Sequence, residues 1–114
     1  MTNNIYIIGG GYIAKEYAKV LKSLNKKFII IDKTSNENFY FKSKFGADVL
    51  SGGLKQILKT GIKIETAIIA TPIDILSEAC IDLLKHGTKN ILLEKPGSLN
   101  IDDLRKIKSL LQRK

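Results

Sequence analysis

The residues that decide the fold are 8–14, which read IGGGYIA and join an apolar run to an amphipathic one. They match the pattern G-x-G-x-x-G/A, with Gly9, Gly11 and Ala14 at the three small positions. Such a first glycine permits a tight turn, the second lets a ligand approach the backbone, and the third residue lets a helix pack close to a strand. A helix that begins here directs free N–H groups toward an anion, so we predict a pyrophosphate site. Its predicted residues are Gly9, Gly10, Gly11, Tyr12 and Ile13. The alternative is that the glycines form only a turn.

Outward from this loop, strand-like and helix-like segments alternate along the whole chain. Apolar runs predict strands at residues 4–8, 27–32, 48–50, 65–70 and 90–93. Helical spacing predicts helices at residues 12–24, 53–60, 74–86 and after Asn100, and we assign the ambiguous residues 36–45 to a short helix. Continuous apolar strands alternating with amphipathic helices predict an α/β fold. We expect a doubly wound, Rossmann-like parallel sheet of about five strands with helices on both faces.

Apolar stripes on these helices predict which residues face the sheet. The predicted stripes are Ile13, Tyr17, Val20, Leu21 and Leu24; Leu54, Ile57 and Leu58; Leu76, Ala79, Cys80, Leu83 and Leu84; and Ile101, Leu104, Ile107 and Leu111. Cys80 is the one cysteine, and its place on a stripe favours a core residue over a nucleophile. His86 is the one histidine; it precedes Gly87 at a helix end, which favours a partner for the helix dipole over a catalytic role. Four aromatic residues fit the core, a wall beside an adenine ring or an aromatic surface, and stacking on nucleic-acid bases is less favoured for them: Phe39, Tyr40, Phe41 and Phe45.

Asp32 ends the second predicted strand, about 20 residues after Gly11, which is the spacing of a ribose-binding carboxylate in dinucleotide sites. A carboxylate there can accept hydrogen bonds from both hydroxyls of the adenosine ribose, and it would repel a 2′-phosphate. This favours NAD as the cofactor. Lys33 follows directly and can partly neutralise a phosphate, so NADP stays open. The alternative is that Asp32 is only a turn residue.

Two further strand ends carry polar residues at the edge of the sheet where ligands bind in doubly wound folds. Ala70 ends the fourth predicted strand, and Thr71 and Pro72 follow it, where proline stops the strand and threonine supplies a hydroxyl. Glu94 and Lys95, held by Pro96, follow the fifth strand, and the lysine could bind a ribose hydroxyl or help in proton transfer. A glutamate–lysine pair on a loop is otherwise usually a solvated ion pair.

Taken in order, the glycine loop, Asp32, residues 70–72 and residues 94–96 resemble the N-terminal half of the Gfo/Idh/MocA dehydrogenases, the family of glucose–fructose oxidoreductase and inositol dehydrogenase. The resemblance covers nearly all of the chain. It implies NAD(P)-dependent oxidation or reduction of a sugar, polyol or sugar nucleotide. It also implies that Lys95 lies near the nicotinamide ribose and the substrate as the catalytic lysine, and that Thr71 and Pro72 line the nicotinamide side. Leu76 stands where members often carry a histidine.

Length and composition exclude several other classes of protein. The chain has 114 residues, a size typical of one domain, and its net charge is +8. The lysines are spread along the chain, which favours a solvated surface over a nucleic-acid interface. Without an apolar run of about 20 residues we expect no membrane span, and without a signal sequence we expect a cytoplasmic protein. With one cysteine and one histidine, we expect no metal site.

We therefore expect residues 1–114 to form one dinucleotide-binding domain. The family's C-terminal substrate domain has no counterpart in this sequence, and we expect no catalysis without a second domain or subunit that binds the sugar-type substrate. The sequence leaves open whether the chain forms a homo-oligomer. The alternative to an enzyme domain is a binding module, either a dinucleotide sensor or a partner subunit, that has no catalysis of its own. A basic nucleic-acid or polyanion binder is the third and less favoured class.

Overall fold

The computed structural model describes residues 4–93 and 101–112. The strands are β1 (Ile5–Ile8), β2 (Phe28–Ile31), β3 (Val49–Leu50), β4 (Thr66–Ile69) and β5 (Asn90–Leu93). The helices are α1 (Tyr12–Ser23), α2 (Asn38–Phe45), α3 (Leu54–Leu58), α4 (Leu76–His86) and α5 (Ile101–Gln112), and a short 3₁₀ helix, Ile73–Ile75, precedes α4. Each predicted strand and helix is confirmed, including the short helix α2. No helix in the part of the chain described here has the length and apolar character needed to cross a bilayer.

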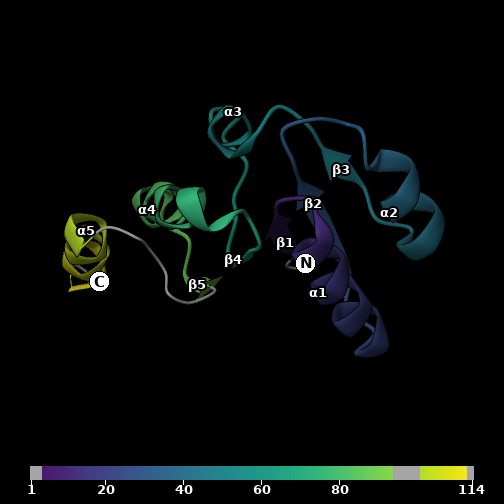
Figure 1. Ribbon diagram of the computed structural model, residues 1–114, viewed down its shortest axis with the longest axis horizontal. Coiled ribbons are helices and arrows are strands. Elements are labelled where there is room, and N and C mark those ends of the chain that lie inside the picture. The colour runs from purple at the N-terminus through teal and green to yellow at the C-terminus, as the bar shows by residue number, and fades with distance from the viewer. Residues whose placement is uncertain (1–3, 94–100, 113–114) are drawn as a thin grey trace.

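Within residues 4–93 the five strands form one parallel sheet in the order β3-β2-β1-β4-β5. The last residue of β1, Ile8, is in register with Ile31 of β2 and Ile69 of β4. Figure 1 shows the sheet as a diagonal, with α1 and α2 on one side and α3, α4 and α5 on the other. The strand order reverses direction at β1, between β2 and β4, which is where ligands bind in doubly wound sheets. The predicted fold class is confirmed.

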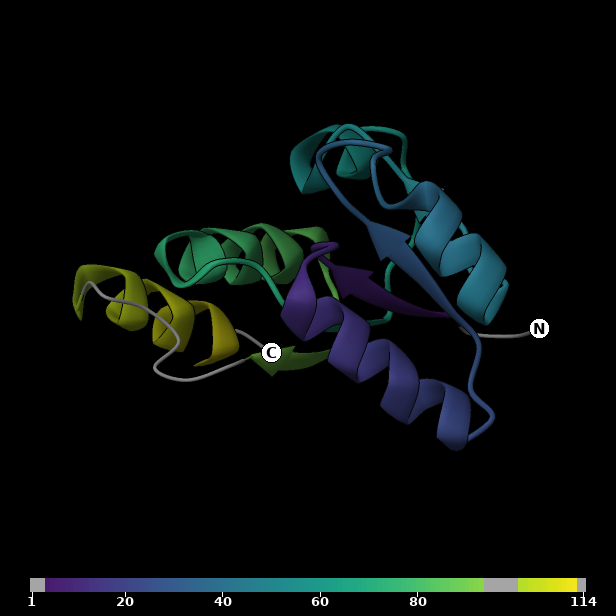
Figure 2. The same cartoon turned by 45° about the vertical axis from the view of Figure 1, so that its right-hand side comes forward.

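Each face of the sheet has its own apolar core, because alternate residues of a strand point to opposite faces. The α1 side buries Ile7, Ile30 and Ile68 under Ala14, Ala18, Leu21 and Phe41. The α4 side buries Ile8, Ile31 and Ile69 under the α4 residues Leu76, Ala79, Cys80, Leu83 and Leu84, as predicted. Figure 2, turned by 45°, shows α1 and α4 on opposite sides of β1.

The predicted buried face of α1 is partly wrong. Ala14, Ala18 and Leu21 are buried, whereas Ile13, Val20 and Leu24 are 43%, 54% and 61% exposed. The two alanines let the helix axis approach the sheet closely, and this close packing sets the rotation of the helix. Residues next to a buried one then turn away by about 100°. In α5, Ile107 is buried, but Leu104 and Leu111 are 40% and 55% exposed, so that prediction is also partly wrong. The side chain of Ile101 lies outside the described residues.

Three of the four aromatic residues of α2, namely Tyr40, Phe41 and Phe45, pack in or against the core. Phe41 is fully buried, and its ring lies 5.3 Å from that of Tyr40 and 6.1 Å from that of Phe45, measured between centroids. Phe39 is 83% exposed. None of the four is among the residues that line the cavity described below, so the structure favours the core over an adenine wall for the buried rings. His86, the last residue of α4, places Nε2 2.7 Å from the carbonyl oxygen of Ile62 and helps to fix the helix end.

Candidate functional site

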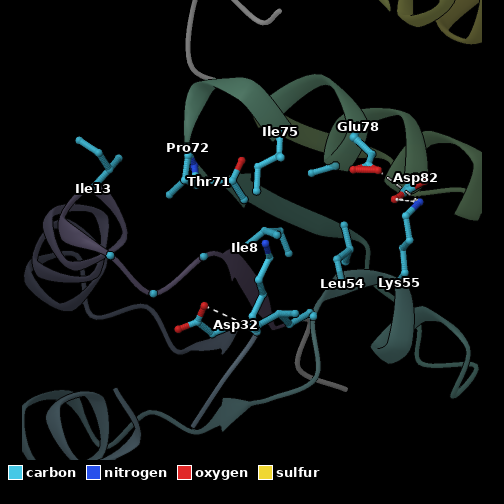
Figure 3. A pocket seen from close by; sticks show the side chains of 18 of the residues that line it. Ile8, Ile13, Asp32, Leu54, Lys55, Thr71, Pro72, Ile75, Glu78 and Asp82 are labelled. Atoms are coloured by element: carbon cyan, nitrogen blue, oxygen red, sulfur yellow. Dashed lines mark hydrogen bonds and ion pairs between the residues drawn. The ribbon is translucent and has the colours of Figure 1, made fainter. Parts of the chain in front are cut away.

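A cavity of about 730 Å³ opens at the carboxyl ends of β1, β2 and β4. Figure 3 looks into it, with α4 forming one wall. Ten residues singled out from the sequence line this one cavity: Gly9, Gly10, Gly11, Tyr12, Ile13, Asp32, Lys33, Ala70, Thr71 and Pro72. The structure thus brings together segments that are up to about sixty residues apart in the chain. The other two predicted site residues, Glu94 and Lys95, lie outside the described residues.

The first glycine holds the loop in place. The Gly9 amide donates a hydrogen bond of 2.7 Å to the carbonyl oxygen of Ile31, which ties the loop to the end of β2. Its φ of +112° lies in the region that favours glycine, and a Cβ atom added there would lie 2.7 Å from the carbonyl oxygen of Ala70. Both the backbone conformation and the contact with the β4 loop therefore require glycine at this position.

Gly11 faces open space at the start of α1. It is the N-cap residue of α1, no side chain caps that end of the helix, and no acidic residue lies in its first turn. A Cβ atom added at Gly11 would meet no atom within 4 Å. The first N–H groups of a helix lack partners within the helix, and this end of the helix dipole is positive. The start of α1 therefore offers an anion both hydrogen-bond donors and room to approach.

Asp32 directly follows β2 and lies beside the glycine loop. Its Oδ1 accepts a hydrogen bond of 2.8 Å from the Lys33 amide, and its carboxylate fills the space next to Gly10. Figure 3 shows the carboxylate below the glycine loop, across the cavity from Thr71. Lys33 is exposed at the cavity rim, and its Cγ lies 4.0 Å from the position that a Cβ would take on Gly53. The sequence spacing between the loop and Asp32 thus corresponds to direct proximity in space.

On the β4 side, Thr71 is a polar group without a partner. Its hydroxyl oxygen is buried, and no described residue forms a hydrogen bond with it. An unpartnered buried hydroxyl is costly unless a ligand or water completes it. Thr71 also lines the cavity beside Pro72, so its unpartnered hydroxyl lies next to the space that a bound molecule would enter.

The far end of the cavity was not anticipated from the sequence. Leu54 of α3 and Ile75 and Ala79 on the α4 side supply apolar walls. Lys55, Glu78 and Asp82 form its polar rim, where Lys55 Nζ lies 2.8 Å from Asp82 Oδ2 and 3.8 Å from Glu78 Oε2. The hydrogen bond to Asp82 raises the pKa of the Lys55 ammonium. The sequence indicates only that these residues belong to the helices that follow β3 and β4. It does not tell which helices converge on the cavity.

The remaining chemistry of the described residues is sparse. Residues 4–93 and 101–112 contain no cluster of His, Cys, Asp and Glu able to hold a metal ion. Cys80 is buried in α4, and this burial raises the pKa of its thiol, which agrees with its predicted place in the core.

The strand order, the glycine loop at the start of α1 and the carboxylate after β2 together define a dinucleotide-binding Rossmann domain. A family model described as the oxidoreductase family, NAD-binding Rossmann fold, matches residues 3–114, and the chain belongs to this Gfo/Idh/MocA oxidoreductase family. NAD is the cofactor of the domain. The cavity fits it, since Gly11 leaves open room at the helix N-terminus and Asp32 faces the same space.

Solved structures of several dehydrogenases share the fold of this chain. The WlbA dehydrogenase from Bordetella pertussis, solved with NADH and UDP-GlcNAcA, is 18% identical with a TM-score of 0.82, covering 99% of this chain and 34% of that one. Myo-inositol 2-dehydrogenase from Lactobacillus plantarum is 21% identical with a TM-score of 0.84, and the match covers 99% of this chain and 34% of that one. UDP-N-acetylglucosamine 3-dehydrogenase from Acidithiobacillus ferrooxidans is 14% identical with a TM-score of 0.77, and the match covers 96% of this chain and 35% of that one. The chain thus spans about a third of the length of these proteins. No curated protein matches it.

Proposed function

We propose that this chain binds NAD in the cavity at the ends of β1, β2 and β4 and forms the nucleotide-binding part of a dehydrogenase. The dehydrogenase would act on a sugar, polyol or sugar nucleotide by transferring a hydride between the substrate carbinol carbon and the cofactor. The observation that carries the proposal is that the open N-terminus of α1 and the Asp32 carboxylate face one cavity. The substrate class is favoured by similar proteins that act on, or were solved with, inositol and sugar nucleotides.

Each part of the cavity suits one part of the dinucleotide. Residues 9–13 would bind the pyrophosphate, because the first N–H groups of α1 and its positive dipole end lie there. Asp32 would accept hydrogen bonds from the adenosine ribose. Leu54, Ile75 and Ala79 would enclose the adenine ring between α3 and α4, since flat apolar rings are held between apolar walls. Ala70, Thr71 and Pro72 would line the nicotinamide side, where the free Thr71 hydroxyl could donate a hydrogen bond.

The charges near the ribose favour NAD over NADP. The Asp32 carboxylate would lie close to a 2′-phosphate and repel it. Lys33 is exposed at the rim and would offset part of this repulsion, so some affinity for NADP is expected. Selectivity therefore depends mainly on where the carboxylate lies.

When bound, NAD supplies the hydride chemistry, and the residues of this chain orient it and exclude water. Lys95 is proposed as the catalytic lysine that assists substrate binding and proton relay, with Glu94 beside it at the nicotinamide end. Both roles rest on the family motif in residues 94–96.

The direct test is calorimetric titration of the protein with NAD⁺. We expect saturable binding by the unmodified chain and about tenfold or greater weakening by Asp32→Ala, since a hydrogen bond to a charged group contributes about 1.5–3 kcal/mol. Asp48→Ala is the matched control, because Asp48 is an exposed carboxylate paired with Lys42 outside the cavity. No binding at millimolar NAD⁺ would refute the proposed function. Equal small effects of the two variants would refute the ribose role of Asp32.

A further inference from the structure

The side chain of Asp32 occupies the space that a side chain at position 10 would need. A Cβ atom added at Gly10 would overlap Asp32 Oδ2 and would lie 2.8 Å from Asp32 Cγ and 3.5 Å from Asp32 Cβ. These three nearest atoms all belong to one side chain. The absence of a side chain at Gly10 is therefore matched to the position of a single carboxylate.

The backbone does not explain glycine at this position. Gly9 has a φ of +112°, whereas the φ of Gly10 lies outside the left-handed region, so other residues could adopt its conformation. Gly11 differs again, because a Cβ there would meet nothing within 4 Å. The three consecutive glycines thus meet three different requirements: backbone conformation at Gly9, space for the carboxylate at Gly10 and room for a ligand at Gly11.

The contact is relieved most easily by moving the Asp32 side chain, because the atoms that the added Cβ would meet belong to the end of that side chain. The backbone of Asp32 is held on both sides, since its amide donates to the carbonyl oxygen of Leu50 at 3.0 Å and its carbonyl accepts from Gly53 at 2.9 Å. The glycine loop is held by the hydrogen bond from Gly9 to Ile31. With both backbones fixed, a methyl group at position 10 would rotate the carboxylate away from the loop.

We propose that Gly10 is a positioning residue for Asp32, and that it thereby determines the selectivity for NAD over NADP. This inference rests on the proposed binding of the adenosine ribose by Asp32. Gly10 leaves the carboxylate beside the loop, where it can accept hydrogen bonds from the ribose and repel a 2′-phosphate. A side chain at position 10 displaces the carboxylate and weakens both effects.

The test is a double-mutant cycle on Gly10→Ala and Asp32→Ala, with dissociation constants for NAD⁺ and NADP⁺ measured by calorimetry. Gly10→Ala is expected to weaken NAD⁺ binding about tenfold when Asp32 is present and less than about twofold in the Asp32→Ala background. The dissociation constant for NADP⁺ divided by that for NAD⁺ should fall by about the same factor in Gly10→Ala when Asp32 is present. An equal loss in both backgrounds would overturn the inference, because the methyl group would then act on the loop or the ligand directly.

Melting temperatures of the same four proteins make the cycle decisive even if a variant folds poorly. The overlap involves the flexible end of a side chain, so Gly10→Ala alone should change Tm by less than about 4 °C. If Gly10→Ala unfolds the protein, recovery of Tm in the double variant supports the contact with Asp32, and failure to recover overturns it. If the unmodified chain does not bind NAD⁺, the proposed function fails. If Asp32→Ala weakens NAD⁺ binding but shows no coupling to Gly10, only the present inference fails.

Discussion

Gly9 lies so close to Ala70 that a Cβ atom added to the glycine would stand 2.7 Å from the Ala70 carbonyl oxygen. The contact joins the loop after β1 to the loop after β4, the two neighbouring strands at which the sheet order reverses. Unlike Gly10, which faces a movable side chain, Gly9 faces backbone. The glycine loop is therefore part of the framework as well as part of the site.

Gly9→Ala should destabilise the protein by about 2 kcal/mol or more, because both the positive φ and the contact with Ala70 penalise a side chain. The free energy of unfolding can be measured by urea denaturation. Gly11→Ala is the matched variant. Its side chain would meet open space, so the protein should remain stable but lose affinity for NAD⁺ as the methyl group fills the room for the pyrophosphate. Equal stability of the two variants would contradict a structural role for Gly9 and a ligand-binding role for Gly11.

Two phenylalanines of α2 should differ sharply although they lie two residues apart. Phe41→Ala should lower the free energy of unfolding by about 3–5 kcal/mol, because the ring is fully buried and its loss leaves a cavity. Phe39→Ala should change it by less than about 0.5 kcal/mol, because that ring is 83% exposed. Urea denaturation of both variants tests this, and similar losses would mean that α2 is turned differently.

The Cys80 thiol should react with a disulfide reagent only when the protein opens. Cys80 is buried, and burial raises the pKa of its thiol, so both access to the reagent and formation of the thiolate are disfavoured in the folded protein. Labelling should be immediate in guanidinium chloride and slow in buffer. NAD⁺ at a hundred times its dissociation constant should slow labelling about a hundredfold if global opening is required. Cys80 is the one cysteine of the chain, so the Cys80→Ala variant is the control for reaction of the reagent with other groups. Rapid labelling of the folded protein would contradict its burial.

The ion pair between Lys55 and Asp82 should contribute little to stability and should depend on pH in one direction. Asp82→Asn should lower the free energy of unfolding by less than about 1 kcal/mol at pH 7, because Lys55 is largely exposed. The hydrogen bond raises the folded pKa of Lys55, so the contribution is fully present below the unfolded pKa and is lost as pH rises through the folded pKa.

The difference between the unmodified protein and Asp82→Asn should therefore shrink above pH 10 and in 1 M salt. Glu78→Gln is the control, since its carboxylate lies farther from Lys55, at 3.8 Å. A difference that grows with pH would exclude the ion pair as its cause.

The order of strands and helices, the glycine loop and Asp32 could all be predicted from the sequence. Periodicity reports which side of an element is apolar, and the loop and Asp32 belong to a pattern whose spacing reflects one crossover between neighbouring strands. Both depend on residues close together in the chain. The same reasoning was less successful for α1, because the small side chains of Ala14 and Ala18 add little to an apolar stripe, although they allow the closest packing.

What only the tertiary structure decided are the contacts between distant segments. Leu54, Ile75 and Ala79 became cavity walls because α3 and α4 converge over the carboxyl ends of the strands. The different requirements met by Gly9 and Gly10 depend on the facing groups, a backbone carbonyl of Ala70 and the carboxylate of Asp32. Spacing along the chain determines which residues can reach the sheet edge. Only packing determines which atoms meet there, because steric overlap depends on distances in space.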